Sequence, residues 1–117
     1  MSQDCIFCKI INDELPAKII YENEYVLAFE DVKPVSPVHT LIVPKKHYES
    51  ILDISASEEG LNDLSHLMTA LKPIAEKLGV DEKGFRLINN YGVEGGQTVM
   101  HVHFHLIGGK DLGPGIL

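Results

Sequence analysis

The stretch HVHFHLIGG, residues 101–109, places three histidines at every second position with hydrophobic residues between them. In a β-strand, residues i, i+2 and i+4 point to one face, at a spacing of about 6–7 Å. His101, His103 and His105 are therefore expected to share a face, while the intervening hydrophobic side chains pack into the core. This pattern predicts a strand over residues 98–107 that carries a row of imidazoles.

The remaining sequence predicts four further strands and two helices around this stretch. β-Branched and apolar runs bounded by turn residues indicate the strands 17–21, 25–29, 39–44 and 85–89. Apolar residues at helical spacing indicate a short N-terminal helix over 5–16 and one long helix over 55–78. Ser55 and Glu58 have the spacing of a capping box at the start of the long helix, and Pro73 is expected to kink it. One long helix between three strands and two predicts an α+β fold with a five-stranded antiparallel sheet.

Eight apolar residues recur at steps of three or four along the predicted long helix. They are Leu61, Leu64, Leu67, Met68, Leu71, Ile74, Ala75 and Leu78. Such a stripe is typical of a helix that packs one face against a core. We expect all eight side chains to face the sheet.

The length and charge of the chain limit its partners. A chain of 117 residues predicts a single domain over residues 1–117. Its formal charge of −7 disfavours nucleic acid and anionic membranes as partners. The start, MSQDCIFCK, lacks the pattern of a signal peptide, and no apolar run has the length of a membrane span. We therefore expect a cytoplasmic protein that acts on a small molecule.

Three imidazoles on one face indicate chemistry, because six buried ring nitrogens would otherwise all need partners. One interpretation is a catalytic metal site, since paired histidines commonly bind zinc. The other is phosphate chemistry, because imidazole is a nucleophile when neutral and a donor when protonated. The upstream segment Gly95-Gly96-Gln97-Thr98 offers backbone N–H groups and a hydroxyl to phosphate oxygens. This combination favours phosphate chemistry.

HVHFHLI resembles the signature of the histidine-triad (HIT) superfamily. The resemblance extends to CIFCKIINDELPAKIIYE, VLAFEDVKPVSPVHTLIVPKKH and NNYGVEGGQTVMHVHFHLIGG, and so to nearly the whole chain. The tail GGKDLGPG resembles the Hint branch of nucleotide-binding phosphoramidases. The resemblance implies a HIT-like fold and transfer of a nucleoside monophosphate group through a covalent histidine intermediate.

The resemblance also implies roles for individual residues. His103 would attack the α-phosphorus, His105 would donate to a phosphate oxygen, and His39 would support the tautomer of the nucleophile. Asp31 would accept hydrogen bonds from the ribose hydroxyls. The base would lie in an apolar slot formed by Val32, Phe29 and Ile10, and the phosphate against Asn90, Gly96, Gln97 and Thr98.

Cys5 and Cys8 form a CxxC pair, which is half of a structural zinc site because such sites use four ligands. The resemblance implies that His47 and His101 complete a zinc site. His101 would then anchor the N-terminal helix and would not relay protons to His103. Alternatives are two inert thiols or a catalytic zinc on the three histidines, which would remove the nucleophile. A redox CxxC is disfavoured because no strand precedes it.

The sequence thus predicts a hydrolase that cleaves phosphoramidate or related bonds of purine nucleoside monophosphates. Two alternatives remain open: a dinucleoside polyphosphate hydrolase, and a nucleotide-binding regulatory protein whose hydrolysis is incidental. The family resemblance also implies a homodimer that forms through the long helix and the adjacent strand.

Overall fold

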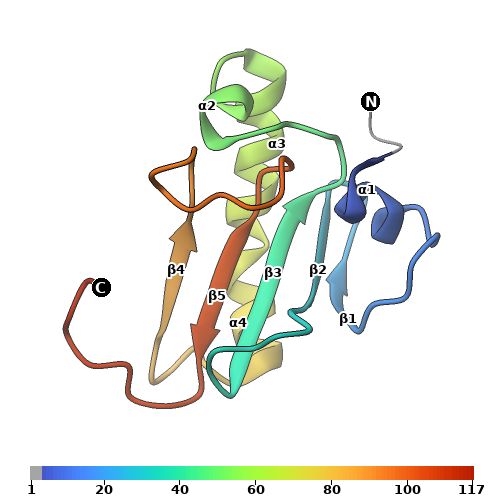
Figure 1. Cartoon of the computed structure of the whole chain (residues 1–117). Helices are drawn as coiled ribbons and strands as arrows, with labels where there is room; N and C mark the ends of the chain where they lie inside the picture. Colours follow the sequence, from blue (N-terminus) through green and yellow to red (C-terminus); the bar gives the residue numbers. More distant parts are fainter. Residues whose placement is uncertain (1–3) are drawn as a thin grey trace.

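The computed structural model describes residues 4–117, and its five strands form one antiparallel sheet in the order β1-β2-β3-β5-β4 (Figure 1). The strands are β1 (Ile19–Glu22), β2 (Val26–Glu30), β3 (Val38–Pro44), β4 (Phe85–Asn89) and β5 (Phe104–Gly108). The central strand β3 pairs with β2 on one side and with β5 on the other. The expected α+β fold with a five-stranded antiparallel sheet is confirmed.

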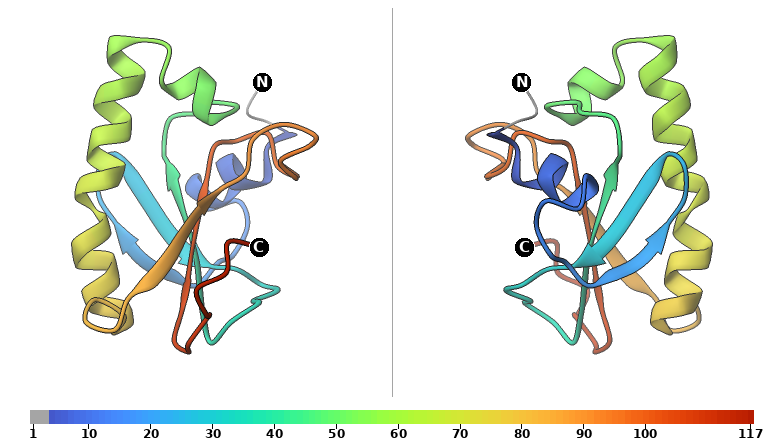
Figure 2. Two further views of the ribbon diagram at one scale, coloured as in Figure 1. Left: turned by 90° about the vertical axis from the view of Figure 1, so that its left-hand side faces the viewer. Right: turned by 90° about the vertical axis from the view of Figure 1, so that its right-hand side faces the viewer.

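The helices cover both faces of this sheet, as Figure 2 shows. They are α1 (Ile6–Ile11), α2 (Ile51–Ile54), α3 (Glu58–Thr69) and α4 (Leu71–Leu78). Helices α3 and α4 follow one another along one face and enclose the larger hydrophobic core, while α1 packs on the opposite face over a second core cluster. Among the described residues, no helix combines the length and hydrophobicity that a membrane crossing requires.

The long helix differs from the prediction at its start and in its middle. Ser57, not Ser55, is the N-cap, and its hydroxyl oxygen accepts a backbone N–H at 3.0 Å. Ser55 instead follows the end of α2. The helical pattern is interrupted at Ala70, three residues before Pro73, because proline lacks the N–H that would continue the ladder. The kink expected from Pro73 takes the form of this interruption.

Two residues of the predicted apolar stripe do not face the core. Leu61 is 51% exposed and Met68 is 37% exposed, seven positions further along α3. Two helical turns separate them, so both lie on one side of the helix. Leu67, Ile74 and Ala75 are buried as expected.

The strand predicted over residues 98–107 begins only at Phe104. Its neighbour β3 ends at Pro44, whose nitrogen has no hydrogen to donate to a ladder. The Pro44 carbonyl oxygen instead lies 2.9 Å from His101 Nε2. The first two histidines of the stretch therefore precede the strand, and only His105 lies within it.

The N-terminal elements lie close to their predicted positions. The helix expected over 5–16 spans Ile6–Ile11, and Asp13 follows it with a positive φ of 62°. The first two strands begin one or two residues later than predicted. The side chain of Asn23 fixes the turn between them, because its carbonyl oxygen accepts two backbone N–H groups.

Candidate active site

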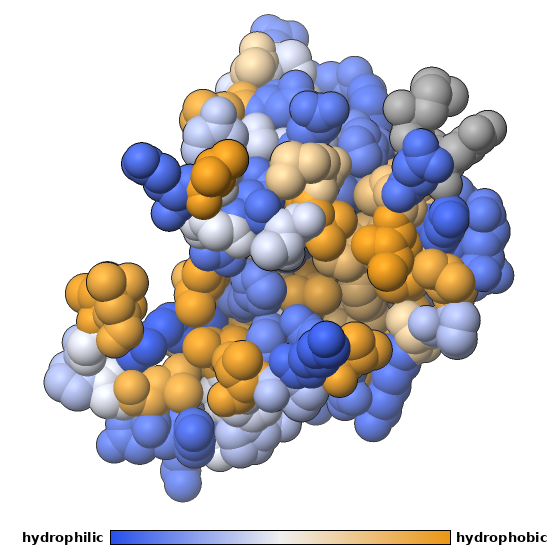
Figure 3. Space-filling view, viewed as in Figure 1, coloured by the Kyte–Doolittle hydropathy of each residue, from blue (hydrophilic) through white to orange (hydrophobic). Residues whose placement is uncertain are grey.

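One cavity of about 370 Å³, between α1 and the sheet, brings many of the predicted site residues together. These residues are Ile10, Phe29, Asp31, Val32, Thr98, His103 and His105. Figure 3 shows hydrophobic side chains gathered around a hollow on this face of the molecule. The cavity therefore has an apolar part, which suits a flat heterocycle, and a polar part that contains two histidines.

His103 is held as a neutral imidazole with one free ring nitrogen. Its side chain is 4% exposed, and Nδ1 lies 2.8 Å from the carbonyl oxygen of His101. Since a carbonyl only accepts, Nδ1 carries the hydrogen and Nε2 keeps its lone pair. Burial lowers the pKa of His103 below its ordinary value. His103 thus has the electronic form that a nucleophile requires.

A chain of hydrogen bonds gives His105 the opposite arrangement. The backbone N–H of Val35 donates to His39 Nδ1 at 3.1 Å, so the hydrogen of His39 is on Nε2. That nitrogen lies 2.9 Å from His105 Nδ1, which therefore accepts. The hydrogen of His105 is consequently on Nε2. A donor nitrogen thus lies beside the nucleophile, with the two rings 5.1 Å apart.

The pKa of His105 is also lowered, first by burial and then by the neighbouring His103 and His39. Asp31 opposes this effect, since its negative charge favours the protonated form. In the absence of an anionic ligand the neutral form is therefore favoured. An anionic phosphate beside the ring would favour the protonated form.

Asp31 lies at the rim of the cavity and supports its loop. One carboxylate oxygen accepts the backbone N–H of Lys33 at 2.8 Å, and the other lies 3.3 Å from His39 Nε2. The two oxygens retain further lone pairs for a ligand. The ligand atoms of Asp31, His39 and His105 lie within 4.8 Å of one another, a spacing that could hold a metal ion. The contacts from His39 to His105 and to Asp31 already explain this proximity without a metal.

The predicted phosphate-contacting residues belong to the loop between β4 and β5, and their side chains largely hold that loop together. Asn90 donates to a loop carbonyl at 2.7 Å. Gln97 accepts one backbone N–H and donates to two carbonyls, one of which belongs to Glu49. Gly96 has a φ of +78°, which favours glycine. Of the four predicted residues, only Thr98 lines the cavity itself.

The second predicted cluster, Cys5, Cys8, His47 and His101, forms a compact set of ligand atoms. Cys5 Sγ lies 3.4 Å from His101 Nδ1, Cys8 Sγ lies 3.3 Å from His47 Nδ1, and the two Nδ1 atoms lie 3.2 Å apart. All four ligand atoms lie within 4.8 Å of one another. Ligand atoms of a tetrahedral zinc ion are separated by roughly 3.3–3.8 Å, given the usual bond lengths, which is close to these distances. The residues present therefore fit a four-coordinate metal ion.

The ring of His101 belongs to this cluster, not to the cavity wall. Its side chain is fully buried, and Nε2 donates to the Pro44 carbonyl at 2.9 Å, so the lone pair is on Nδ1 and faces the sulfur atoms. Burial lowers the pKa of His101 from 6.5 to about 4. A neutral imidazole with its second nitrogen bonded to a carbonyl is the usual form of a metal ligand. His101 reaches the nucleophile only through its backbone carbonyl.

Several groups that fix these side chains were not predicted from the sequence. The amide of Val35 and the carbonyl of Pro44 act through the backbone, which leaves no signal in residue identity. Tyr48 and Asp63 form a buried side-chain pair between the segment after β3 and α3. Asp63 could have been noticed in the sequence. It precedes the buried Leu67 by four residues and so lies on the same face of the helix, where an acidic residue is unusual.

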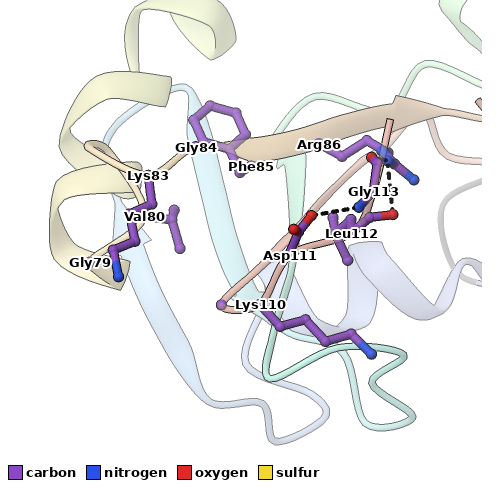
Figure 4. Close-up of a pocket in the computed structure, with 11 residues that line it drawn as sticks. Gly79, Val80, Lys83, Gly84, Phe85, Arg86, Lys110, Asp111, Leu112 and Gly113 are labelled. Carbon is purple, nitrogen blue, oxygen red and sulfur yellow. Dashed lines mark hydrogen bonds between the residues drawn. The ribbon is translucent and has the colours of Figure 1, made fainter. Parts of the chain in front are cut away.

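A larger cleft, of about 760 Å³, contains none of the predicted residues. Figure 4 shows that it lies between the α4–β4 turn and the segment that follows β5. Arg86 donates there to the carbonyl of Gly113 at 2.8 Å. This cleft is at the far end of β5 from the histidines.

Comparison with known proteins reveals close relatives. The model of the HIT domain family matches residues 12–112. The purine nucleoside phosphoramidase of Escherichia coli K12 is 43% identical over 114 residues, covering 97% of this chain and 94% of the relative. An uncharacterised HIT-like protein of Synechococcus elongatus is 47% identical, covering 96% of each chain.

Solved structures give the same result. A HIT family hydrolase from Clostridium thermocellum has a TM-score of 0.92 at 49% identity and covers 98% of both chains. A histidine triad protein from Clostridium difficile has a TM-score of 0.88 at 49% identity and covers 95% of both chains. The family match includes all six histidines of the chain, whereas Cys5 and Cys8 lie before its first residue.

Proposed function

The chain belongs to the HIT family and is a hydrolase, and we propose that it cleaves phosphoramidate bonds of purine nucleoside monophosphates through a nucleotidyl-His103 intermediate. The observation that carries this proposal is the pair of imidazoles in one cavity, one with a free lone pair and one with a free N–H. The E. coli relative named as a purine nucleoside phosphoramidase supports the choice of substrate.

In the first proposed step, the lone pair of His103 Nε2 attacks the α-phosphorus and the bond from phosphorus to the amine breaks. The phosphate beside His105 favours its protonated form, in which Nδ1 also carries a hydrogen and the Nε2–H of His39 donates to Asp31 Oδ2, 3.3 Å away, instead of to His105. The departing amine takes up the proton on His105 Nε2. Water then attacks the phosphorus and displaces His103, and the proton that water loses returns to His105. The N–H of His105 also stabilises negative charge on the phosphate oxygens.

Substrate placement follows from the two ends of the cavity. We propose that the base lies in the apolar part beside Ile10, Phe29 and Val32. The ribose hydroxyls then donate to Asp31 at the rim. The phosphate lies between the histidines and the loop that holds Asn90, Gly96, Gln97 and Thr98. The backbone of this loop and the Thr98 hydroxyl supply the hydrogen bonds.

A comparison of two substrates tests the proposal. We expect a higher kcat/KM for an adenosine phosphoramidate than for a diadenosine polyphosphate. The reverse preference would identify a dinucleoside polyphosphate hydrolase. Tight nucleotide binding without turnover of either compound would favour a regulatory nucleotide-binding protein and would contradict the enzymatic proposal.

We propose that Cys5, Cys8, His47 and His101 hold a structural zinc ion. The ion would tie α1 to the segment that carries the nucleophile, and its four protein ligands would leave no open position for substrate. Support comes from the ligand geometry and from the Nε2–H of His101, which leaves Nδ1 free. Metal analysis should find about one zinc per chain in the wild-type protein and none in Cys5→Ser/Cys8→Ser. Zinc retained by the double variant would contradict this assignment.

We further propose a homodimer in the cytoplasm. Leu61 and Met68 expose hydrophobic surface on α3, and β4 is an edge strand whose outer side has no partner in the described sheet. A second copy of the chain would cover both features. A reducing compartment such as the cytoplasm keeps cysteine thiols available as metal ligands.

A further inference from the structure

Among the described residues, Asp63 is the only acidic side chain that is buried. It lies on α3 with 8% of its surface exposed, and its Oδ2 accepts a hydrogen bond from the Tyr48 hydroxyl at 2.5 Å. Burial of a carboxylate is unfavourable unless hydrogen bonds compensate for its lost hydration, so the Tyr48 hydroxyl and the Asp63 carboxylate hold each other in place.

Tyr48 connects α3 to the segment that contains the nucleophile. Its backbone carbonyl accepts the N–H of Val102 at 2.7 Å, and its ring packs in one hydrophobic cluster with Val102 and Ile54. Val102 is the residue between His101 and His103. The side-chain hydroxyl of Tyr48 is thus bonded to α3, and its backbone carbonyl is bonded to the histidine stretch.

The nucleophile depends on such bonds because it lies outside the sheet. Residues 97–103 belong to neither a helix nor a strand, and neither do residues 45–50. The Val102 N–H bonds to Tyr48, and the adjacent His101 carbonyl accepts the Nδ1–H of His103. Any shift of the Tyr48 backbone would therefore move the carbonyl that orients the nucleophilic ring.

We infer that Tyr48 and Asp63 are positioning residues, whose buried hydrogen bond fixes the Tyr48 carbonyl and thereby the Val102 amide, the His101 carbonyl and the ring of His103. This inference rests on the proposed function, because it assigns His103 as the nucleophile. The bond runs between side chains that never touch the substrate cavity. Its effect on the reaction is therefore indirect, through the placement of the histidine stretch that carries His103.

The electrostatics of the pair keep this bond in place. Burial, followed by the Asp63 hydrogen bond, raises the pKa of Tyr48, so that its hydroxyl remains a donor throughout the physiological range. Lys46 lies over the Tyr48 ring at 5.4 Å and pairs with Glu59 of α3 at 2.6 Å, which adds a second link between the same two segments.

Three variants separate positioning from stability. Tyr48→Phe removes the donor and keeps the ring, Tyr48→Phe/Asp63→Leu removes the bond without leaving an unpaired carboxylate, and Asp63→Asn keeps an acceptor for the hydroxyl. Ile74→Val is the matched control, because it weakens the core beneath α4 and touches none of these bonds. The readouts are kcat and KM for an adenosine phosphoramidate, hydrogen exchange of the Val102 amide, and ¹⁵N shifts of the His103 ring.

We expect Tyr48→Phe and the double variant to lower kcat by about tenfold or more at a nearly unchanged KM, since small misplacements of a reacting group are costly. Both should also speed hydrogen exchange of the Val102 amide. The single variant Asp63→Asn should retain most of the wild-type kcat, because it keeps an acceptor for the Tyr48 hydroxyl. A loss of kcat no larger than that of Ile74→Val, or unchanged Val102 exchange, would overturn the inference. If the wild-type protein does not hydrolyse the phosphoramidate, the proposed function fails, whereas Val102 exchange and the His103 ring shifts still test the positioning.

Discussion

At the scale of single residues, the reactivity of the two cavity histidines depends on which ring nitrogen is already bonded. His103 gives its Nδ1–H to a carbonyl, and His105 accepts at Nδ1 from His39. The same side chain thus provides a lone pair in one position and a donor in the other. Both rings are neutral imidazoles on one stretch of chain, so the distinction comes from their neighbours: the carbonyl of His101 for His103 and the side chain of His39 for His105.

The role of His39 leads to a first prediction. His39→Ala removes the donor that fixes the tautomer of His105, so we expect kcat to fall about 10²-fold or more, as when other catalytic histidines lose their orienting partner. The ¹⁵N shifts of His105 should change from one tautomer to a mixture. His66→Ala, at a histidine that stacks on Tyr25 outside the cavity, should leave kcat unchanged. Full activity in His39→Ala with an unaltered His105 tautomer would contradict the assignment.

Acid sensitivity of the metal-free protein is a second prediction. Between pH 6.5 and pH 4 the unfolded chain binds a proton at His101 that the folded chain does not bind, because burial lowers the folded pKa to about 4. Stability is therefore complete above pH 6.5 and falls as the pH drops toward 4. The loss from this residue alone is about 3 kcal/mol. The lowered pKa values of His103 and His105 act in the same direction.

Urea unfolding of chelator-treated protein at several pH values measures this loss. The control is His101→Asn, which should show a shallower decline between pH 6.5 and pH 4. Equal slopes for the two proteins would contradict the attribution to His101.

The histidines and cysteines that the structure brings together could be singled out from the sequence, but the groups that fix their ring nitrogens could not. Histidines at every second position and a CxxC pair are rare enough to indicate chemistry. The donors and acceptors that fix each ring nitrogen are the amide of Val35 and the carbonyls of Pro44 and His101. Every residue type except proline has both a backbone N–H and a backbone C=O, so residue identity does not indicate which of these groups bonds to a histidine ring.

At the scale of elements, the contact between α2 and α3 leads to a third prediction. A side chain at Gly60, in the first turn of α3, would overlap the carbonyl oxygen of Ile54 at the end of α2. Helix propensity alone favours alanine over glycine by about 1 kcal/mol. We expect the clash to dominate, so that Gly60→Ala lowers the free energy of unfolding by about 1–3 kcal/mol.

Urea unfolding checks the sign of this change. Ser65→Ala, at an exposed position of the same helix, should alter stability by less than about 0.5 kcal/mol. A Gly60→Ala protein more stable than the wild type would show that α2 moves away without cost.

The predicted elements were largely correct, and the errors have local causes. Alternating histidines and hydrophobic residues do indicate extended chain, but a strand also needs a neighbour with free backbone groups, and β3 ends at Pro44. The spacing to Glu58 predicted Ser55 as the cap of the long helix, whereas Ser57 is the cap in the structure. Ser55 is not free to cap the long helix because it ends α2, a single helical turn that no periodic pattern predicts.

At the scale of the whole molecule, the exposed side chains of α3 lead to a fourth prediction. Periodicity alone does not distinguish a residue that faces the core from one that faces a partner, and Leu61 and Met68 fitted both. We expect Leu61→Glu/Met68→Glu to convert a dimer into a folded monomer, because two charges would then face each other across the interface. Sedimentation analysis measures the mass. The control is Leu52→Glu, at an exposed residue of α2, which should leave the wild-type mass unchanged. A wild-type protein that sediments as a monomer would contradict the dimer.

The whole molecule brings two chemical sites to the two sides of one histidine stretch. The cavity receives the rings of His103 and His105, while the ring of His101 turns to the two cysteines at the start of α1. The proposed function depends most on one claim, that His103 forms a covalent bond to phosphorus. All other assignments in the cavity describe how that bond is made possible.

Intact-mass measurement of the protein, quenched during turnover of an adenosine phosphoramidate, tests this claim most directly. We predict a transient gain of one adenylyl group in the wild-type protein. His103→Ala should show neither this gain nor turnover, while it still binds the nucleotide and keeps its fold. Turnover by His103→Ala at the wild-type rate would contradict the claim, whether or not an adduct is seen in the wild type.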